Sequence, residues 1–216
     1  MSNTTKPLLE EVFGNNRVCA IAGDKSTGKT NNLAALARNF RKFNKTTQIL
    51  VYGVEDTTLR WLRNLGNVFE ISSLSQLSNK KDCLIFIDEF QRLNLNNRRY
   101  RHLLDETINF IYHNNNWVIF CSPNLREYNS VIGSKIERWL LKSLRLSSLV
   151  NGSQLKDIVL AYNGRFKSIE DIDIKKNQLL IINSEYEKVI DLEYIQEIDE
   201  KLNKINIFDM YGNKNL

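Results

Sequence analysis

The sequence predicts an α/β protein built in three layers, with a mostly parallel central sheet covered by helices on both faces. Short runs that are apolar at nearly every position alternate, along the first part of the chain, with segments whose apolar residues recur at helical spacing. Strands that are apolar on both faces are typical of a parallel sheet that is buried on each side. Nearer the C-terminus, Asn163-Gly164 lies between two β-like runs. This dipeptide predicts antiparallel hairpin strands there.

Five apolar runs predict the strands of the parallel part of the sheet, over residues 17–22, 48–54, 67–72, 82–90 and 116–124. Apolar residues at helical spacing predict the helices between them, over residues 30–43, 57–65 and 98–114. The second of these helices has Asp56 or Thr57 as a suitable N-cap, because either side chain can accept a hydrogen bond from the first turn.

A different pattern follows Pro123. It predicts a helix over 134–146, β-like strands within 155–174 and 178–192, and a closing helix over 193–205. These elements show no linker, so we expect the tail to flank the main sheet. We therefore expect a single domain over 1–216, with a core over 17–125 and a C-terminal part over 126–216.

The composition is that of a soluble globular protein, with 42% hydrophobic and 25% charged residues in a chain of 216. No apolar run approaches the ~20 residues that cross a bilayer, and the N-terminus lacks the layout of a secretory signal. We therefore expect a cytoplasmic protein. Cys19, Cys83 and Cys121 form no CxxC pair, and each lies in or beside an apolar run, which predicts buried free thiols. The net charge of +5 permits a polyanionic partner without requiring one.

Residues 23–30, Gly-Asp-Lys-Ser-Thr-Gly-Lys-Thr, match the Walker A pattern GxxxxGK[ST] between a predicted strand and a predicted helix. The glycines let successive N–H groups turn toward phosphate oxygens, and the start of the helix adds its positive end. Lys29 reaches the β- and γ-phosphates, and the hydroxyl of Thr30 ligates Mg²⁺. We expect ATP to bind to Gly23, Asp24, Lys25, Ser26, Thr27, Gly28, Lys29 and Thr30.

Asp88 and Glu89 follow the buried run LIFI at the end of a predicted strand. Ligands of open α/β sheets bind at the carboxyl ends of the strands, so both acids are expected beside the loop. Asp88 is the second residue expected to hold Mg²⁺. Glu89 is expected to polarise the attacking water, as ATP hydrolysis requires. The alternative is that the two acids only cap the next helix.

The order GDKSTGKT, FIDEF and VIFCSPN resembles the additional-strand, catalytic-glutamate branch of P-loop ATPases. With Lys25 in the loop, it resembles the viral genome-packaging ATPases of the FtsK/HerA type over residues 17–190. The resemblance implies a strand between the Walker A and Walker B strands, whose polar end senses the γ-phosphate through Ser122 or Asn124. It also implies a ring that translocates double-stranded DNA and docks on a capsid or portal, in the host cytoplasm or on the virion.

Two basic clusters are candidates for contact with the DNA backbone. Lys135, Arg138, Lys142 and Arg145 are spaced by three or four residues, which places them on one face of the predicted helix 134–146. The second cluster follows the Walker B acids and contains Arg92, Arg98, Arg99 and Arg101. Both could instead be solvated helix faces. Arg126 and Arg138 are the candidates for an arginine that completes a neighbouring subunit's site, and Lys25 is a further catalytic candidate, acting within its own subunit or across the interface.

Two other functions fit the same motifs. A non-motor ATPase that binds partners, such as a helicase loader or a conjugation accessory, needs the same loop. The stretch DEFQ is similar to thymidine kinases. Those kinases carry a zinc site of cysteines and a late glycine-rich loop, and this sequence has neither.

Overall fold

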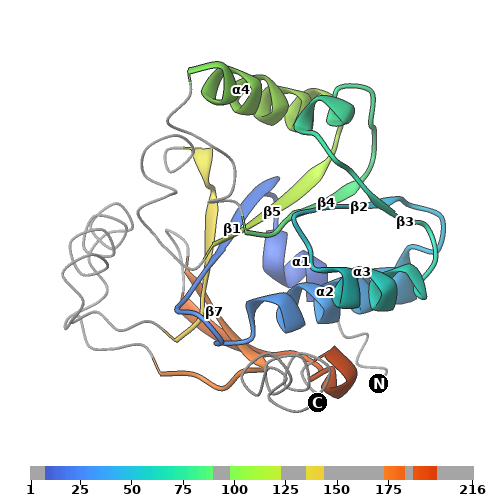
Figure 1. Ribbon diagram of the computed structural model, residues 1–216. Helices are drawn as coiled ribbons and strands as arrows, with labels where there is room; N and C mark the ends of the chain where they lie inside the picture. The colour runs from blue at the N-terminus through green and yellow to red at the C-terminus, as the bar shows by residue number, and fades with distance from the viewer. Residues whose placement is uncertain (1–7, 90–97, 123–134, 144–172, 183–186, 199–216) are drawn as a thin grey trace, which may run out of the picture.

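In the computed structural model of this protein, the described residues are 8–89, 98–122, 135–143, 173–182 and 187–198. Within them, eight strands form one sheet in the order β3-β2-β4-β5-β1-β6-β7-β8 (Figure 1). The strands are β1 Val18–Ala22, β2 Ile49–Tyr52, β3 Val68–Glu70, β4 Leu84–Ile87, β5 Trp117–Ser122, β6 Arg138–Leu141, β7 Gln178–Ile182 and β8 Glu187–Asp191.

The sheet is parallel from β3 to β6, and β7 and β8 are added to it antiparallel. This arrangement confirms the predicted fold class, a three-layer P-loop NTPase with antiparallel strands near the C-terminus. Strand β5 lies between β1 and β4, as the resemblance implied. In the register, Ala22 is beside Ser122, and Ile87 is beside Phe120. The carboxyl ends of these three strands therefore meet at one edge of the sheet.

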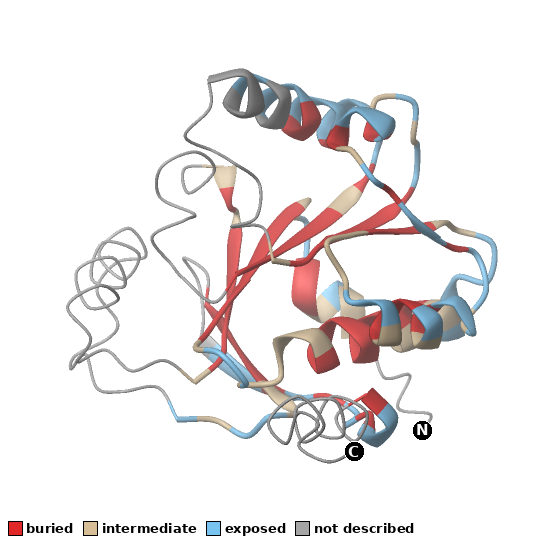
Figure 2. Cartoon of the chain, in the orientation of Figure 1, coloured by how far each residue is buried: buried red, intermediate tan, exposed pale blue. Residues whose placement is uncertain are grey.

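Helices cover both faces of the sheet (Figure 1). They are α1 Leu8–Phe13, α2 Lys29–Phe43, α3 Asp56–Arg63, the 3₁₀ helix η1 Leu74–Leu77 and α4 Arg98–His113. One buried cluster joins the sheet to α1, α2 and α3, and the other joins it to η1 and α4. Figure 2 shows the central strands buried between the two layers. The chain thus forms two cores on a shared sheet. The three cysteines are buried and free, as predicted.

The predicted helix over 134–146 is wrong, because Arg138–Leu141 forms strand β6. This strand pairs with β1 on one side and with β7 on the other. Trp139 and Leu141 enter the core under α4, whereas Leu140 enters the core under α2. A strand buried on both faces gives a continuous apolar run, which cannot be told from a buried helix by periodicity alone.

Other boundaries differ in smaller ways. The N-cap of α3 is Glu55, one residue before the predicted positions. Helices α1 and η1 were not predicted. Of the closing helix predicted over 193–205, helical backbone is described at 196–198. The Asn163-Gly164 turn lies outside the described residues.

Candidate active site

The phosphate-binding loop connects β1 to α2. Gly28, the N-cap of α2, has a φ of +89°. A Cβ at this position would also lie 2.7 Å from the carbonyl oxygen of Lys176, so a side chain there is excluded by both backbone conformation and space. Since Gly28 precedes the first helical N–H groups of α2, it places the positive end of the helix at the loop.

In the described structure, the loop is closed on itself through Lys29. The ammonium of Lys29 donates to the carbonyl oxygens of Gly23, at 2.9 Å, and Asp24, at 2.7 Å. The hydroxyl of Thr27 also donates to the Asp24 carbonyl, at 2.8 Å. Burial lowers the pKa of Lys29. The side chain therefore already lies within the loop, where it can exchange these carbonyls for phosphate oxygens.

Thr30 and Asp88 converge at the start of α2 and the end of β4. The Thr30 hydroxyl donates to Oδ2 of Asp88 at 3.1 Å, and the backbone N–H of Glu89 donates to Oδ1 at 2.9 Å. Burial raises the pKa of Asp88, and hydrogen bonds from Glu89, Cys121 and Thr30 oppose that rise. One hydroxyl and one carboxylate fit Mg²⁺, which takes few protein ligands besides water and substrate phosphates. The described residues contain no cluster of three or more histidines, cysteines and acids that would suit another metal.

Glu89 lies one residue beyond Asp88, with a φ of +45°. This backbone conformation is uncommon for a residue with a side chain, and such strain concentrates at functional sites. Gly53 supports the same turn: its φ is +70°, and a Cβ there would lie 2.4 Å from the carbonyl oxygen of Asp88. The Asp88 N–H donates to the Tyr52 carbonyl at 2.8 Å. The β2–α3 connection therefore packs directly on the acidic turn.

Two residues of β5 complete the described part of the site. Ser122 is fully buried at the carboxyl end of the strand, and its contact with the γ-phosphate stays a prediction. The Cys121 side chain hydrogen-bonds to Asp88, and burial raises the pKa of Cys121 well above its usual value. The sequence analysis treated Cys121 only as a core residue. Pairing of β4 with β5 would have placed it beside Asp88, because Ile87 and Phe120 are neighbours in the register.

Two residues of the predicted basic helix are misassigned, because both are buried in or beside β6. The guanidinium of Arg138 donates to the carbonyl oxygens of Glu11, at 2.7 Å, and Val12, at 3.0 Å. These bonds cap the end of α1, so Arg138 does not face solvent as an arginine finger must. Lys142 is fully buried, and its ammonium binds backbone carbonyls. Neither residue is available to DNA.

The remaining basic candidates differ in position. Lys135 forms an ion pair with Asp105 of α4, at 2.5 Å, with about a third of its side chain exposed. Lys25 is exposed in the phosphate-binding loop. Arg98, Arg99 and Arg101 belong to the beginning of α4, but their side chains lie outside the described part of the structure. Arg126, Asn124 and Arg145 also lie outside the described residues.

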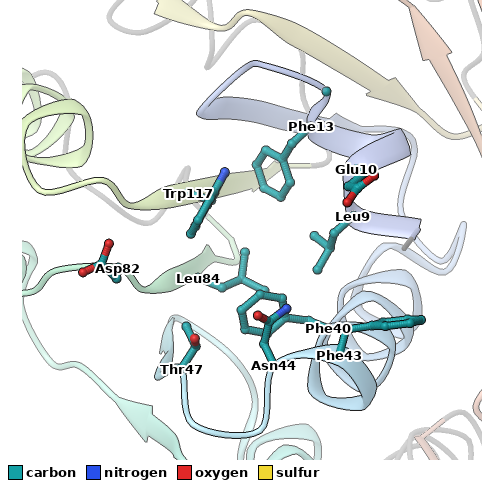
Figure 3. Close-up of a pocket in the computed structure, with 11 residues that line it drawn as sticks. Leu9, Glu10, Phe13, Phe40, Phe43, Asn44, Thr47, Asp82, Leu84 and Trp117 are labelled. Carbon is teal, nitrogen blue, oxygen red and sulfur yellow. The ribbon is translucent and has the colours of Figure 1, made fainter. Parts of the chain in front are cut away.

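A cavity of about 330 Å³ lies at the opposite edge of the sheet, between α1, the end of α2 and the starts of β4 and β5 (Figure 3). Its walls are mainly aromatic and aliphatic, with Phe13, Phe40, Leu84 and Trp117 among the lining residues. Leu84 and Trp117 are the first residues of their strands. The cavity is therefore at the amino-terminal edge of the sheet and is separate from the phosphate-binding loop.

The fold has counterparts among solved structures. The DNA-packaging ATPase B204 from Sulfolobus Turreted Icosahedral Virus has a TM-score of 0.61 and 14% identity, covering 83% of this chain and 98% of that one. EssC (ATPases 2 and 3) from Geobacillus thermodenitrificans has a TM-score of 0.60 and 11% identity, covering 92% of this chain. The cytoplasmic domain of the type VII secretion ATPase EccC from Thermomonospora curvata has a TM-score of 0.58 and 10% identity over 85% of this chain. The chain spans 45% of that EssC structure and 24% of that EccC structure.

Comparison by sequence identifies the family. No curated protein matches the chain, but residues 15–130 match the family described as an AAA domain. Within the described part of the chain, every helix falls short of the length and hydropathy needed to cross a membrane. The matched residues include the phosphate-binding loop, the acidic turn and β5, so the chain belongs to the AAA domain family and is a P-loop ATPase.

Proposed function

We propose that this protein is a ring-forming motor that uses ATP hydrolysis to translocate double-stranded DNA, most specifically in viral genome packaging. The observation that carries the proposal is the likeness in fold to the packaging ATPase B204, which covers 98% of that protein. The sequence resemblance to packaging ATPases, carried by Lys25 and the order of the three motifs, supports the same function.

In this proposal, ATP binds along residues 23–30, and Lys29 leaves the carbonyls of Gly23 and Asp24 to contact the β- and γ-phosphates. Thr30 and Asp88 would hold Mg²⁺, which supplies charge neutralisation to the phosphate oxygens. The Glu89 carboxylate orients the attacking water and accepts its proton as the water oxygen bonds to the γ-phosphorus. The bond from that phosphorus to the β–γ bridging oxygen breaks in the same step, and ADP and phosphate are the products. Ser122, at the end of β5, contacts the γ-phosphate and distinguishes ATP from ADP.

The proposed DNA contacts now rest on the beginning of α4. Arg98, Arg99 and Arg101 lie at the beginning of α4, the helix that follows the acidic turn in the sequence. Arg145 remains a proposed contact, and Lys135 is a weaker one because of its ion pair with Asp105. Arginine contacts to the DNA backbone are sequence-independent and weaken as salt rises.

A ring is proposed because the sequence resemblance implies an arginine that completes a neighbouring subunit's site. Arg126, which follows β5, is the proposed trans-acting arginine, since Arg138 caps α1. Lys25 is exposed on the loop and is proposed to contact the γ-phosphate of its own or a neighbouring site. The capsid or portal is the proposed docking partner, and the host cytoplasm or the virion the proposed location.

The decisive experiment measures ATP hydrolysis by the whole chain with and without linear double-stranded DNA, over a series of salt concentrations. We expect DNA to stimulate hydrolysis, salt to weaken the stimulation, and Glu89→Gln to accumulate as an ATP-bound ring by light scattering. Hydrolysis that is unaffected by DNA and stimulated by a polypeptide would instead favour the secretion ATPases that share the fold. Turnover that requires a nucleoside acceptor would contradict the motor and support a kinase.

A further inference from the structure

Lys142 lies directly after β6 and is fully buried, yet it carries an ammonium group. That ammonium donates to three backbone carbonyls, those of Lys175 at 3.0 Å, Lys176 at 2.9 Å and Gln178 at 2.5 Å. All three carbonyls belong to one turn that leads into β7, which we call the 175–178 turn. A buried cation is tolerated when it is fully hydrogen-bonded, and here each of its three protons has an acceptor.

The 175–178 turn packs against the phosphate-binding loop. The Lys176 carbonyl oxygen, which accepts from Lys142, lies 2.7 Å from the position a Cβ of Gly28 would occupy. The first turn of α2 therefore rests on a carbonyl that Lys142 holds in place. Loss of the ammonium would remove the three hydrogen bonds that tie this turn to Lys142, which favours rearrangement of the turn.

The other end of the Lys142 side chain touches the beginning of the same loop. A Cβ on Gly23 would lie 2.3 Å from the Cβ of Lys142. The backbone N–H of Lys142 donates to the Ala22 carbonyl at 2.8 Å. The carbonyl oxygen of the next residue, Ser143, accepts from the Asp24 N–H at 3.0 Å. Lys142 thus contacts the loop at its first glycine and, through the 175–178 turn, at its second.

From this geometry we infer that Lys142 is a positioning residue of the phosphate-binding loop: it fixes the distance between the two loop glycines by binding the 175–178 turn. The inference requires only that ATP binds at the loop. A loop that is fixed at both ends needs less ordering when its N–H groups bind phosphate, so the expected effect is on nucleotide affinity. The hydrolytic machinery at Asp88 and Glu89 belongs to another strand.

Ser143 binds Ile174, the residue directly before the 175–178 turn, and so provides an independent way to loosen that turn. Its hydroxyl donates to the Ile174 carbonyl at 2.9 Å and accepts from the Ile174 N–H at 3.0 Å. Ser143→Ala removes both bonds and leaves the Lys142 ammonium in place. Both substitutions are therefore expected to change nucleotide affinity in the same direction.

The test compares Lys142→Met, which keeps the aliphatic stem, with Lys81→Met, which removes an exposed lysine before β4. Binding of a fluorescent ATP analogue and steady-state hydrolysis are measured after cooperative unfolding has been verified. For Lys142→Met we expect the Kd and KM to rise about tenfold or more, as loss of a charge-assisted hydrogen bond would produce, with kcat changed less. Lys81→Met should match the wild type.

Ser143→Ala should raise the Kd in the same direction by a smaller factor, and it carries the test if Lys142→Met does not fold. A Kd within twofold of the wild type in a folded Lys142→Met, or in Ser143→Ala when the first variant does not fold, overturns the inference. A fall in kcat with unchanged KM would also overturn it, because that pattern indicates a role in chemistry and not in loop position.

Discussion

The hydroxyl of Thr30 lies 3.1 Å from the Asp88 carboxylate, joining two residues 58 positions apart in the sequence. The hydrogen bond brings together the start of α2 and the end of β4, which are the two elements that a P-loop ATPase uses to hold its metal. The hydroxyl and the carboxylate are therefore already adjacent, as the proposed Mg²⁺ site requires.

We expect Asp88→Asn to abolish Mg²⁺-dependent hydrolysis, with kcat lower by about 100-fold or more, because the amide offers the ion no negative charge. Burial raises the pKa of Asp88, so the neutral amide should be tolerated in the fold. The measurement is hydrolysis against Mg²⁺ concentration, with thermal unfolding as the control. Hydrolysis by Asp88→Asn at the wild-type rate would contradict the metal-binding role.

Gly53 gives a second prediction, with Gly66 as a matched control. Both have positive φ, +70° and +76°, but a Cβ on Gly53 would lie 2.4 Å from the Asp88 carbonyl oxygen, whereas nothing lies within 4 Å of one on Gly66. Gly66→Ala should lower the free energy of unfolding by about 1–2 kcal/mol through backbone strain alone. Gly53→Ala should lower it by at least about 1 kcal/mol more, because the acidic turn must shift.

Only Gly53→Ala is expected to reduce kcat, since the shift acts on Asp88 and Glu89. Urea unfolding and steady-state hydrolysis measure the two effects separately. Equal losses of stability and activity in the two variants would show that the contact with Asp88 has no functional consequence.

The site divides into parts that are local in sequence and parts that are not. The loop at residues 23–30 and the Asp88–Glu89 pair are continuous stretches whose flanking strands and helix are strongly patterned, so their positions in the fold were predictable. Gly53, Cys121 and Lys142 enter the site through strand pairing, which a single sequence does not specify. The error at β6 has the same origin: the spacing of Lys135, Arg138 and Lys142 fits a helix face, but pairing with β1 and β7 decided the conformation.

Arg138 allows a direct test of structural against catalytic roles. Its guanidinium donates to the carbonyls of Glu11 and Val12, so Arg138→Met should lower the free energy of unfolding by roughly 2–4 kcal/mol, because both charge-assisted hydrogen bonds to α1 are lost. The kcat of the remaining folded protein should be unchanged. Arg63→Met is the control, since this side chain is 52% exposed and pairs with Glu70 at 3.4 Å, an interaction worth about 0–1 kcal/mol. A lower kcat with unchanged stability would contradict the structural role and support Arg138 as the arginine finger.

Lys142 also predicts how stability depends on pH. Burial, and to a lesser extent the nearby charge of Lys29, lower the pKa of Lys142 to about 7. In the unfolded chain the amine keeps its ordinary pKa near 10.5. Between these values the unfolded state binds one more proton than the folded state, so the free energy of unfolding rises as pH increases. The cost of burying the charge is complete below pH 7 and is relieved above it.

The contribution of Lys142 is isolated by subtracting the unfolding free energy of Lys142→Met from that of the wild type. From about pH 6.5 to about pH 8.5, this difference should increase by roughly 1–2 kcal/mol in favour of the wild type. Urea unfolding at each pH provides the values, and Lys81→Met should show no such trend. A difference that stays constant, or falls as pH rises, would mean that the three carbonyl acceptors keep the ammonium protonated throughout, and that the positioning of the loop does not depend on pH.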